Sequence, residues 1–548
     1  MKKFRKPIAL LLAVLMGTSL LTGCTGSSDS GSGTSQEGGE SSATVSQTDG
    51  NFNAEGFPIV NEKVTKHFMI NKPAHIGNPD DMVTLQKYEE MTNVDVEWEV
   101  VSSDGFSERV NLVMASDSMP DAILKGVPDI TKTSADGSII DISGLIDEYS
   151  VGIKSLYDQY PEVYEASKSP DGGIYAVPNI NTLVPNRTNH RNLWINQTWL
   201  DNLGLETPET LDEYLDVLRA FRDEDANGNG DPSDEIPYVV EYSGGDHRAR
   251  VNIFLGSWGI HDNLGYEFLT IQDDKVNMYV IDDTYKEVLQ FMNTMWTEGL
   301  LDNSLYTQTN DVALSKFNSD VSGSFALSSD DLWSAYSEDY SPLAPPTNSN
   351  GDTPVIGLNS AYGGAAMVIT RSDESPEITL RWIDYFFTEE GANFIGALSP
   401  DLEGITCQKM EDGSYDYSDE ILNSDKGVSM AVGEVCPLPG GGFPYWRNEN
   451  NSDFIYSKKV QESVPVYEPY YQTDPAYAYP VFSVEDAEVV NDIRRDLDTY
   501  LKECEAKFIT GEMSFDQWDE YVATCEQMRI HELEEIFQAA YDRMKESA

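Results

Sequence analysis

The stretch TLDEYLDVLRAFRDEDANGNGDPSDEIPY, residues 210–238, has the sequence pattern of a helix, a loop and a strand in succession. Thr210 and Glu213 have the spacing of a capping box, which marks a helix start. Leu211, Leu215, Leu218 and Phe221 then recur at helical spacing, so we predict an amphipathic helix over 211–222. The apolar IPY that closes the stretch predicts a strand. A helix followed by a short loop and a strand favours an α/β protein.

The loop inside this stretch alternates acids and amides in a way that suits calcium. Asp225, Asn227, Asn229, the turn residue Gly230 and Asp231 follow the spacing of an EF-hand, with Asp231 contributing its backbone carbonyl. The bidentate glutamate of position twelve is missing, because Ile236 stands there. We predict a structural calcium site with the oxygen ligands Asp225, Asn227, Asn229, Asp231, Asp234 and Glu235. The alternative is an acidic turn that holds no ion.

The rest of the chain repeats the alternation of strands and helices. The predicted strands have the sequences TKHFMINK (65–72), VDVEWEVV (94–101) and PDAILKG (120–126). Further helices are predicted over 285–302, 374–391, 484–511 and 514–544, the last with Ser514 and Gln517 as its capping box. Such alternation predicts α/β domains that bind ligands at the carboxyl ends of their strands.

Length and charge limit the classes of function. A chain of 548 residues is too long for one hydrophobic core, so we expect two or more domains. The net charge of −58 repels phosphate backbones and anionic lipid head groups, which argues against a nucleic-acid partner.

The N-terminus predicts export and a lipid anchor. Four basic residues and an apolar run precede the sequence LLTGC, which resembles a bacterial lipobox ending at Cys24. We predict a signal peptide over 1–23, whose removal takes the net charge from −58 to −62 and leaves Cys24 to carry the lipid. An ordinary signal peptide with an incidental cysteine is the alternative. Residues 24–56 are rich in Gly, Ser and acids and predict a flexible tether.

Catalytic signatures are missing from the sequence, whereas aromatic residues stand in loop-like contexts. There is no P-loop, no G-x-S-x-G motif and no zinc-protease motif, and the cysteines match no zinc pattern. Trp258, Trp333, Tyr362 and Trp446 lie among Gly, Ser, Pro and Asn residues. Exposed aromatic rings beside polar side chains suit sugars, although core packing or a loop anchor is the more frequent explanation for any one of them alone.

The ordered motifs resemble the bacterial extracellular solute-binding proteins of family 1. The resemblance rests on residues 192–238, on MPDAI, GGIYAVPN and VSGSFALSSDDLW, and on the closing KFITGEMSFDQWDEYVATCEQM. It implies a two-lobed type II periplasmic-binding-protein-like fold, with α/β lobes joined by hinge strands. The expected lobes comprise 57–182 with about 360–400, and 183–355 with about 401–548.

The same resemblance implies a function and a set of ligand-binding residues. The protein is expected to bind a carbohydrate between its lobes, to stay anchored outside the cell membrane, and to deliver the ligand to an ABC transporter permease. The implied ligand-binding residues are Asp121, Asn181, Trp258, Trp333, Tyr362 and Trp446. The alternatives are a receptor for a peptide or another solute, and a secreted glycoside hydrolase.

Overall fold

The computed structural model describes residues 50–547, apart from 74–75, 117, 189–191, 241–250, 252, 263–267, 328–333, 412, 427, 449–457 and 473–477. The predicted signal peptide, Cys24, most of the tether and Trp333 lie outside the described residues. Everything described belongs to one unit, residues 48–548. No described helix is both long and apolar enough to cross a membrane.

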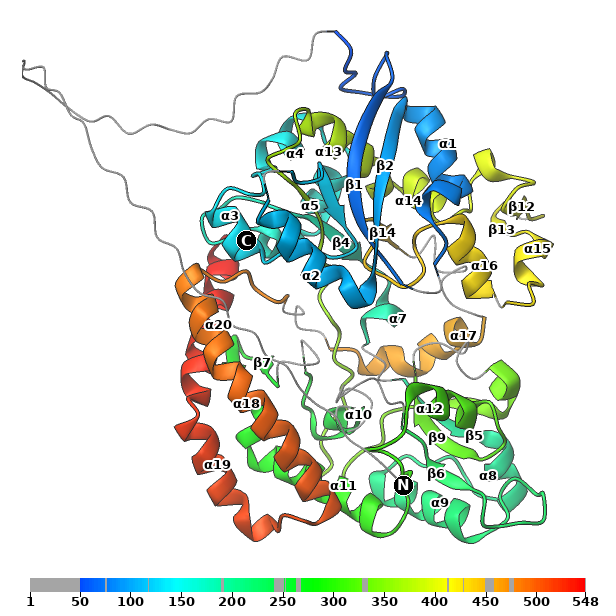
Figure 1. The fold of residues 1–548 in the computed structure, drawn as a ribbon. Helices are drawn as coiled ribbons and strands as arrows, with labels where there is room; N and C mark the ends of the chain where they lie inside the picture. Colours follow the sequence, from blue (N-terminus) through cyan, green and yellow to red (C-terminus); the bar gives the residue numbers. More distant parts are fainter. Residues whose placement is uncertain are drawn as a thin grey trace, which may run out of the picture. The chain divides into compact units, whose positions relative to one another are not determined.

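A six-stranded sheet forms the framework of the first half (Figure 1). Its order is β14-β4-β11-β3-β1-β2, with β1 (Val64–Lys72), β2 (Val94–Ser102), β3 (Ala122–Leu124), β4 (Val177–Asn181), β11 (Tyr362–Ile369) and β14 (Trp446–Arg447). β1, β2 and β3 are parallel to one another, β11 is antiparallel to both β3 and β4, and β14 is parallel to β4. All strands except β11 therefore run in the same direction. Their carboxyl ends and the start of β11 lie along the same side of the sheet, which we call its carboxyl-end edge.

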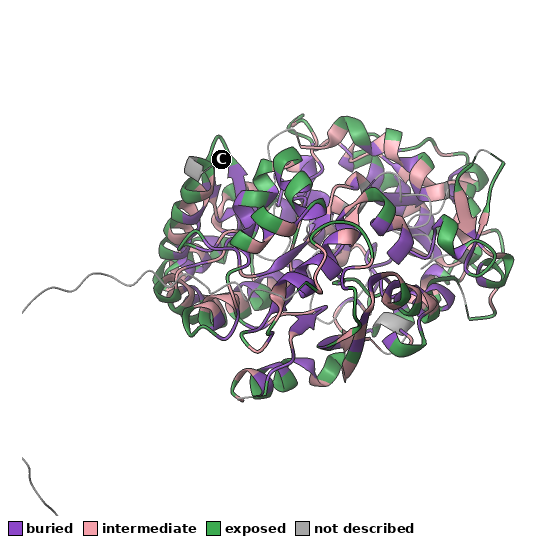
Figure 2. Ribbon diagram, turned by 90° about the horizontal axis from the view of Figure 1, so that it is seen from above, coloured by how far each residue is buried: buried purple, intermediate pink, exposed green. Residues whose placement is uncertain are grey.

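Aromatic packing against this sheet explains why its strands are buried. Trp382 of α13 (Pro376–Asp384) packs edge-on against Phe68 of β1 and Tyr88 of α1 (Val83–Thr92), with ring centroids 5.3 and 5.2 Å apart. All three side chains are fully buried. α2 (Ser103–Met114) covers the other face with Phe106, Val110 and Val113. Figure 2 shows the same division into buried strands and helices with exposed outer faces.

A four-stranded sheet, β10-β5-β9-β6, anchors a second core. Its strands are β5 (Leu193–Asn196), β6 (Ile236–Tyr238), β9 (Ser322–Ala326) and β10 (Tyr340–Leu343). The helices of this core include α8 (Gln197–Leu203), α9 (Leu211–Asp223), α11 (Asp283–Thr297), α18 (Val484–Thr510), α19 (Trp518–Gln527) and α20 (Ile530–Ser547). The C-terminal helices thus return to residues near the middle of the chain (Figure 1).

Local signals in the sequence set the ends of these elements. The capping box of Thr210 and Glu213 is confirmed at the start of α9, and that of Ser514 and Gln517 opens a 3-10 turn before α19.

The other described α-helices and the two hairpins are α3 (Ile130–Ala135), α4 (Ser143–Tyr149), α5 (Gly152–Gln159), α6 (Pro161–Ser167), α7 (Val184–Arg187), α10 (Ile253–Leu255), α12 (Asn310–Phe317), α14 (Glu389–Ile395), α15 (Asp419–Leu422), α16 (Val428–Val435), α17 (Lys458–Tyr467), β7–β8 (Thr270–Gln272, Lys275–Asn277) and β12–β13 (Cys407–Lys409, Tyr415–Tyr417).

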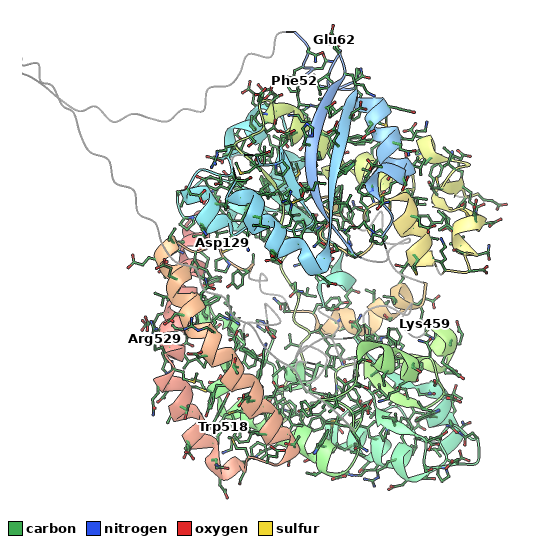
Figure 3. The ribbon with its side chains drawn as sticks, viewed as in Figure 1. Phe52, Glu62, Asp129, Lys459, Trp518 and Arg529 are labelled. Atoms are coloured by element: carbon green, nitrogen blue, oxygen red, sulfur yellow. The ribbon has the colours of Figure 1, made fainter. Side chains whose placement is uncertain are left out.

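Two segments pack differently from the division that the sequence suggests. Phe52, assigned to the tether, pairs with Val60 and contacts the ring of Tyr149, so the packed chain begins before residue 57 (Figure 3). Residues from Leu402 to Tyr445 contribute to the core of the six-stranded sheet, although the sequence groups 401–548 with the other lobe. The boundaries of the lobes stay a prediction.

Candidate ligand-binding site and calcium loop

Three of the predicted ligand-binding residues meet at the carboxyl-end edge of the six-stranded sheet. Tyr362 at the start of β11 and Trp446 in β14 both pair with Ile180, on opposite sides of β4. Asn181 ends β4, and its backbone N–H donates to the carbonyl of Ala361 at 2.8 Å. The topology therefore brings an amide, a phenol and an indole from distant parts of the chain to one edge.

The backbone and neighbouring polar groups hold these side chains in place. The indole N–H of Trp446 donates to Thr182 Oγ1 at 3.0 Å, and Thr182 N–H donates to the carbonyl of Arg447 at 2.8 Å. Burial raises the pKa of Tyr362 to about 12, so its phenol is a neutral hydrogen-bonding group at pH 7. Tyr362 and Trp446 are partly buried and pack against the core of this sheet, and together with Asn181 they supply neutral hydrogen-bonding groups.

Arg447 is a residue of this edge that the motif search missed. It follows Trp446 in β14, lies opposite Asn181, and donates through Nε to the hydroxyl of Tyr445 at 2.7 Å. Its guanidinium carbon lies 5.6 Å from the centre of that ring. The signal that could have found it is its place directly after the predicted Trp446.

Asp121 lies away from this group. It precedes β3, at the opposite edge of the sheet from the strand carboxyl ends, and its Oδ2 accepts the backbone N–H of His67 at 2.8 Å. Burial raises the pKa of its carboxyl group. The residue borders an open pocket of about 600 Å³, together with Trp98 and Arg109. Asp121 stands at the amino end of its strand, whereas Asn181 stands at the carboxyl end of a parallel strand. The two residues therefore lie at opposite ends of the sheet, and a short sequence motif does not reveal this difference.

Trp258 belongs to the second core. It ends a 3-10 helix, η3 (Gly256–Trp258), is partly buried, and donates its indole N–H to Glu287 Oε2 of α11 at 3.0 Å. Its ring contacts Phe291 edge-on at 5.9 Å. Trp258 is thus held against α11 and keeps part of its surface accessible. Its predicted counterpart Trp333 is among the residues that are not described.

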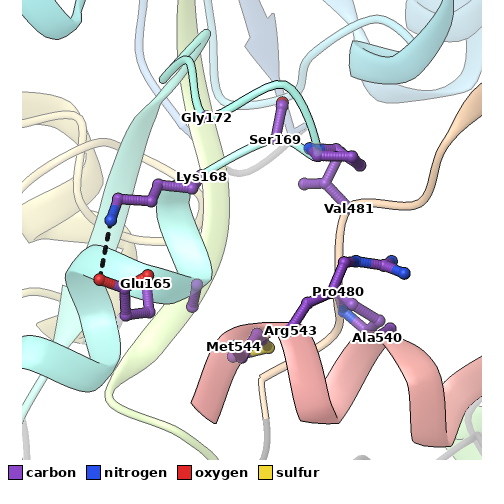
Figure 4. Close-up of a pocket in the computed structure, with 11 residues that line it drawn as sticks. Glu165, Lys168, Ser169, Gly172, Pro480, Val481, Ala540, Arg543 and Met544 are labelled. Atoms are coloured by element: carbon purple, nitrogen blue, oxygen red, sulfur yellow. Dashed lines mark hydrogen bonds and ion pairs between the residues drawn. The ribbon is translucent and has the colours of Figure 1, made fainter. Parts of the chain in front are cut away.

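A further pocket, of about 200 Å³, lies between α6 with the turn that follows it and α20 (Figure 4). Lys168 pairs with Glu165 at 2.8 Å on one side, and Pro480, Val481 and Met544 line the other. None of the six predicted ligand-binding residues lines this pocket, so it is distinct from the strand-end edge.

The predicted calcium loop is closed by hydrogen bonds among the predicted ligands. Asp234 accepts the side-chain amides of Asn227 and Asn229, at 3.2 and 2.8 Å. Asp225 Oδ2 accepts the N–H of Gly230 at 3.0 Å, and Glu235 Oε1 accepts the N–H of Ala226 at 3.0 Å. The positive φ of Gly230, +92°, permits the wrap. The loop is therefore folded back on itself by hydrogen bonds between its own side chains and backbone.

Two oxygens of this loop are left without a partner. Asp225 Oδ1 and Glu235 Oε2 are buried and accept no hydrogen bond from the described residues. Burial also raises the pKa of Glu235. A buried, unpaired carboxylate oxygen is costly, and a bound cation would satisfy both. Within the described ranges no group of three or more His, Cys, Asp and Glu side chains is placed to hold a metal ion.

The sheet order and the C-terminal helices that return to the second core fit the type II fold of solute-binding proteins, as the sequence predicts. The chain belongs to the bacterial extracellular solute-binding protein family, whose model matches residues 78–393. Members of this family are binding proteins.

The chain is similar to several known proteins, among them FusA, a Bifidobacterium longum infantis solute-binding protein and AlgQ2. The fructooligosaccharide ABC transporter substrate-binding protein FusA of Streptococcus pneumoniae serotype 4 is 26% identical over 525 residues, which are 91% of this chain and 94% of FusA. The structure of FusA in complex with kestose has a TM-score of 0.73 at 25% identity, and covers 88% of this chain and 100% of FusA.

The other two share the fold. A solute-binding protein of Bifidobacterium longum infantis, associated with an HMO-binding ABC transporter, has a TM-score of 0.76 at 20% identity over 88% of this chain and 99% of its own. The alginate-binding protein AlgQ2, solved without calcium ion, has a TM-score of 0.69 at 21% identity over 88% of this chain and 99% of its own. FusA has also been solved as an EF-hand mutant with fructo-nystose.

Proposed function

We propose that this protein binds an oligosaccharide and delivers it to an ABC transporter. The observation that carries the proposal is the meeting of Asn181, Tyr362 and Trp446 at the carboxyl-end edge of β4, β11 and β14. Aromatic faces stack on the CH faces of sugar rings, and the amide and phenol match their hydroxyls. FusA, which resembles the chain over nearly its whole length, is a fructooligosaccharide-binding protein.

We propose Asn181, Tyr362, Trp446 and Arg447 as the ligand-binding residues of the first sheet. Trp258 and Trp333 remain proposed contacts from the second core. For Asp121 a ligand role is the weaker proposal, because it lies at the other edge of the sheet.

A panel of fructooligosaccharides, human milk oligosaccharides and alginate oligosaccharides, followed by isothermal titration calorimetry, tests the binding. We expect one class to bind with micromolar or tighter affinity and to be recovered unchanged. Hydrolysis of the bound sugar would point to the glycoside hydrolase alternative, and binding of peptides alone would point to a receptor for another solute.

The 225–235 loop is proposed to hold calcium through Asp225, Asn227, Asn229, Asp231, Asp234 and Glu235. Support comes from the two buried oxygens without a hydrogen-bond partner and from the EF-hand of FusA. A bound cation would supply charge neutralisation between α9 and β6 and take no part in ligand contact.

A lipid anchor on Cys24 and a permease partner complete the proposal. Mass spectrometry of the protein extracted from membranes tests the anchor, because a diacylglycerol-modified Cys24 would be the new N-terminus. Transport of the bound sugar by cells that lack this protein would contradict the proposed delivery.

A further inference from the structure

Lys125 is a buried lysine at the carboxyl end of β3. Its ammonium donates to the carbonyl oxygens of Pro437 and Pro439, at 2.9 and 3.1 Å, and the residue is 6% exposed. Its backbone N–H donates to Ala366 of β11 at 3.0 Å, which fixes the base of the side chain. The side chain therefore ties the sheet to a segment more than three hundred residues later in the sequence.

That segment leads directly to the proposed ligand contacts. After Pro439 come Gly440, Gly441 and Gly442, with φ of +80°, +69° and +74°. Asn179 then holds the carbonyl of Phe443 at 2.7 Å, and Trp446 pairs with β4. Glycine adopts such left-handed φ values without a steric penalty, so these three residues constrain the path of the segment less than other residues would. Because they stand between two anchors, the position of the segment depends on both Asn179 and Lys125.

We propose that Lys125 is a positioning residue for the oligosaccharide site: it clamps residues 437–439 and so fixes the glycine segment that presents Trp446 and Arg447. The inference deepens the proposed function and rests on it. Lys125 touches no ligand itself, and it acts through the placement of β14.

The charge of Lys125 gives the clamp a pH dependence. Burial lowers the pKa of its ammonium to about 8, and the nearby Cys436 opposes this shift slightly. Burial also raises the pKa of the Cys436 thiol to about 12, so this thiol stays neutral across the range considered. An unclamped state with an exposed Lys125 would keep the ordinary pKa, so the clamped state holds fewer protons between about pH 8 and pH 10.5, and the neutral amine still has two N–H groups for the two carbonyls.

A rise in pH through this window therefore raises the population of the clamped segment, and apparent affinity rises with the fraction of competent protein. We expect sugar affinity to rise, by up to roughly tenfold, between pH 7 and pH 9.5. A residue with a purely structural role would leave the pH profile of binding unchanged.

Two measurements test the proposal. In the first, the panel sugar that binds is titrated into the wild type, Lys125→Met and Lys125→Arg at both pH values. Lys125→Met should bind about tenfold more weakly at pH 7 and show no pH dependence. Lys125→Arg, which stays charged, should recover the affinity and be flat across pH. Lys66→Met is the matched control, since Lys66 is a buried lysine on β1 whose partner is Asp373.

The second measurement needs no ligand. Hydrogen exchange at pH 7 in peptides that cover residues 437–447 should be faster in Lys125→Met than in the wild type or in Lys66→Met. Unchanged exchange, or a Lys125→Met variant that binds sugar as the wild type does, would overturn the clamp. If exchange responds while the wild type binds no sugar, the clamp stands and the proposed function fails. If Lys125→Met does not fold, the wild type and Lys125→Arg decide by their pH profiles, and parallel profiles overturn the clamp.

Discussion

Asp384 is a buried carboxylate that accepts four hydrogen bonds in the core of the six-stranded sheet. It is 1% exposed and accepts the N–H groups of Val151, Gly152 and Ile153, at 2.8, 3.0 and 2.9 Å, together with the hydroxyl of Ser150. These donors are the otherwise unsatisfied amides at the start of α5, which lacks a capping side chain of its own. A residue of α13 thus supplies the N-terminal cap of another helix.

We expect Asp384→Asn to destabilise the fold. The amide removes the negative charge and turns an NH₂ donor toward groups that are donors themselves. The loss in the free energy of unfolding should be about 3 kcal/mol, measured by urea denaturation. Asp158→Asn, an exposed acid on α5, should change stability by less than about 0.5 kcal/mol. Equal effects of the two substitutions would contradict the capping role.

Trp446 is the aromatic residue on which the proposed site depends most. We expect Trp446→Ala to weaken sugar binding by about 1–3 kcal/mol, the usual cost of a lost stacking aromatic, with calorimetry as the measurement. Trp296→Ala is the matched control, because Trp296 packs against Tyr306 in the second core. Full affinity in Trp446→Ala would remove the indole from the site.

Lys125 also predicts a pH dependence of stability. Its pKa is about 8 in the folded protein and near the ordinary 10.5 in the unfolded chain. The unfolded chain therefore holds more protons between these values, and stability rises with pH across that window. Relative to Lys125→Met, the wild type should gain about 2 kcal/mol between pH 8 and pH 10.5 in denaturant titrations. A constant difference between the two proteins would show that the lysine is not buried.

For single residues, the sequence could predict which residue types are candidates for the site, but not at which end of the sheet each one lies. Asn181, Tyr362 and Trp446 stand in recognisable motifs, and the sheet brings them together. Asp121 stands in an equally recognisable motif and lies at the other edge. Lys125 carries no local signal, because its partners Pro437 and Pro439 are defined only by the tertiary fold.

Among the elements, the α9–loop–β6 unit agrees most closely with the prediction made from its sequence. The capping box, the apolar stripe and the Gly-rich loop are local signals, so they need no tertiary information. The two-residue strand β14 shows the opposite case. Its sequence contains no strand pattern, and it exists only because β4 offers an edge for pairing.

The 225–235 loop yields a prediction about metal removal. Chelation of calcium should lower the melting temperature while sugar affinity is nearly kept in the folded protein, because the loop joins α9 to β6 and lies outside the proposed contacts. Glu235→Gln should reduce the response to calcium, and Glu224→Gln, the exposed neighbour at the end of α9, should not. Loss of sugar binding in the still-folded, calcium-free protein would contradict a structural role.

The whole molecule carries a net charge of −58, and the predicted mature chain −62. Such a chain repels itself in the compact state, and salt screens this repulsion. We expect the melting temperature to rise by roughly 2–4 °C between 20 and 300 mM sodium chloride. The scan should be run with calcium held constant. A melting temperature independent of salt would mean that local ion pairs compensate the net charge.

Fold class follows from the sequence at this scale, whereas the assignment of segments to cores does not. Alternating strands and helices predict an α/β protein, and the family motifs predict the type II fold. Residues 402–445 return to the first core through contacts such as Tyr417 and Cys436, which no periodic pattern announces. Cys407, Cys436, Cys504 and Cys525 are buried free thiols. They form no disulfide bond that could have indicated which segments belong to the same core.

The pairing of Trp446 with Ile180 also has a consequence for biosynthesis. A ribosome makes β1, β2, β3 and β4 long before it reaches β14, so β4 first exists as an open border of the nascent sheet. Until Trp446 and Arg447 emerge, its backbone amides and carbonyls are available to any other extended chain. A polypeptide that ends early, before residue 446, would keep that border exposed. Such fragments should aggregate even though most of the six-stranded sheet is complete. In the finished protein the two residues of β14 pair with β4 and cover this border.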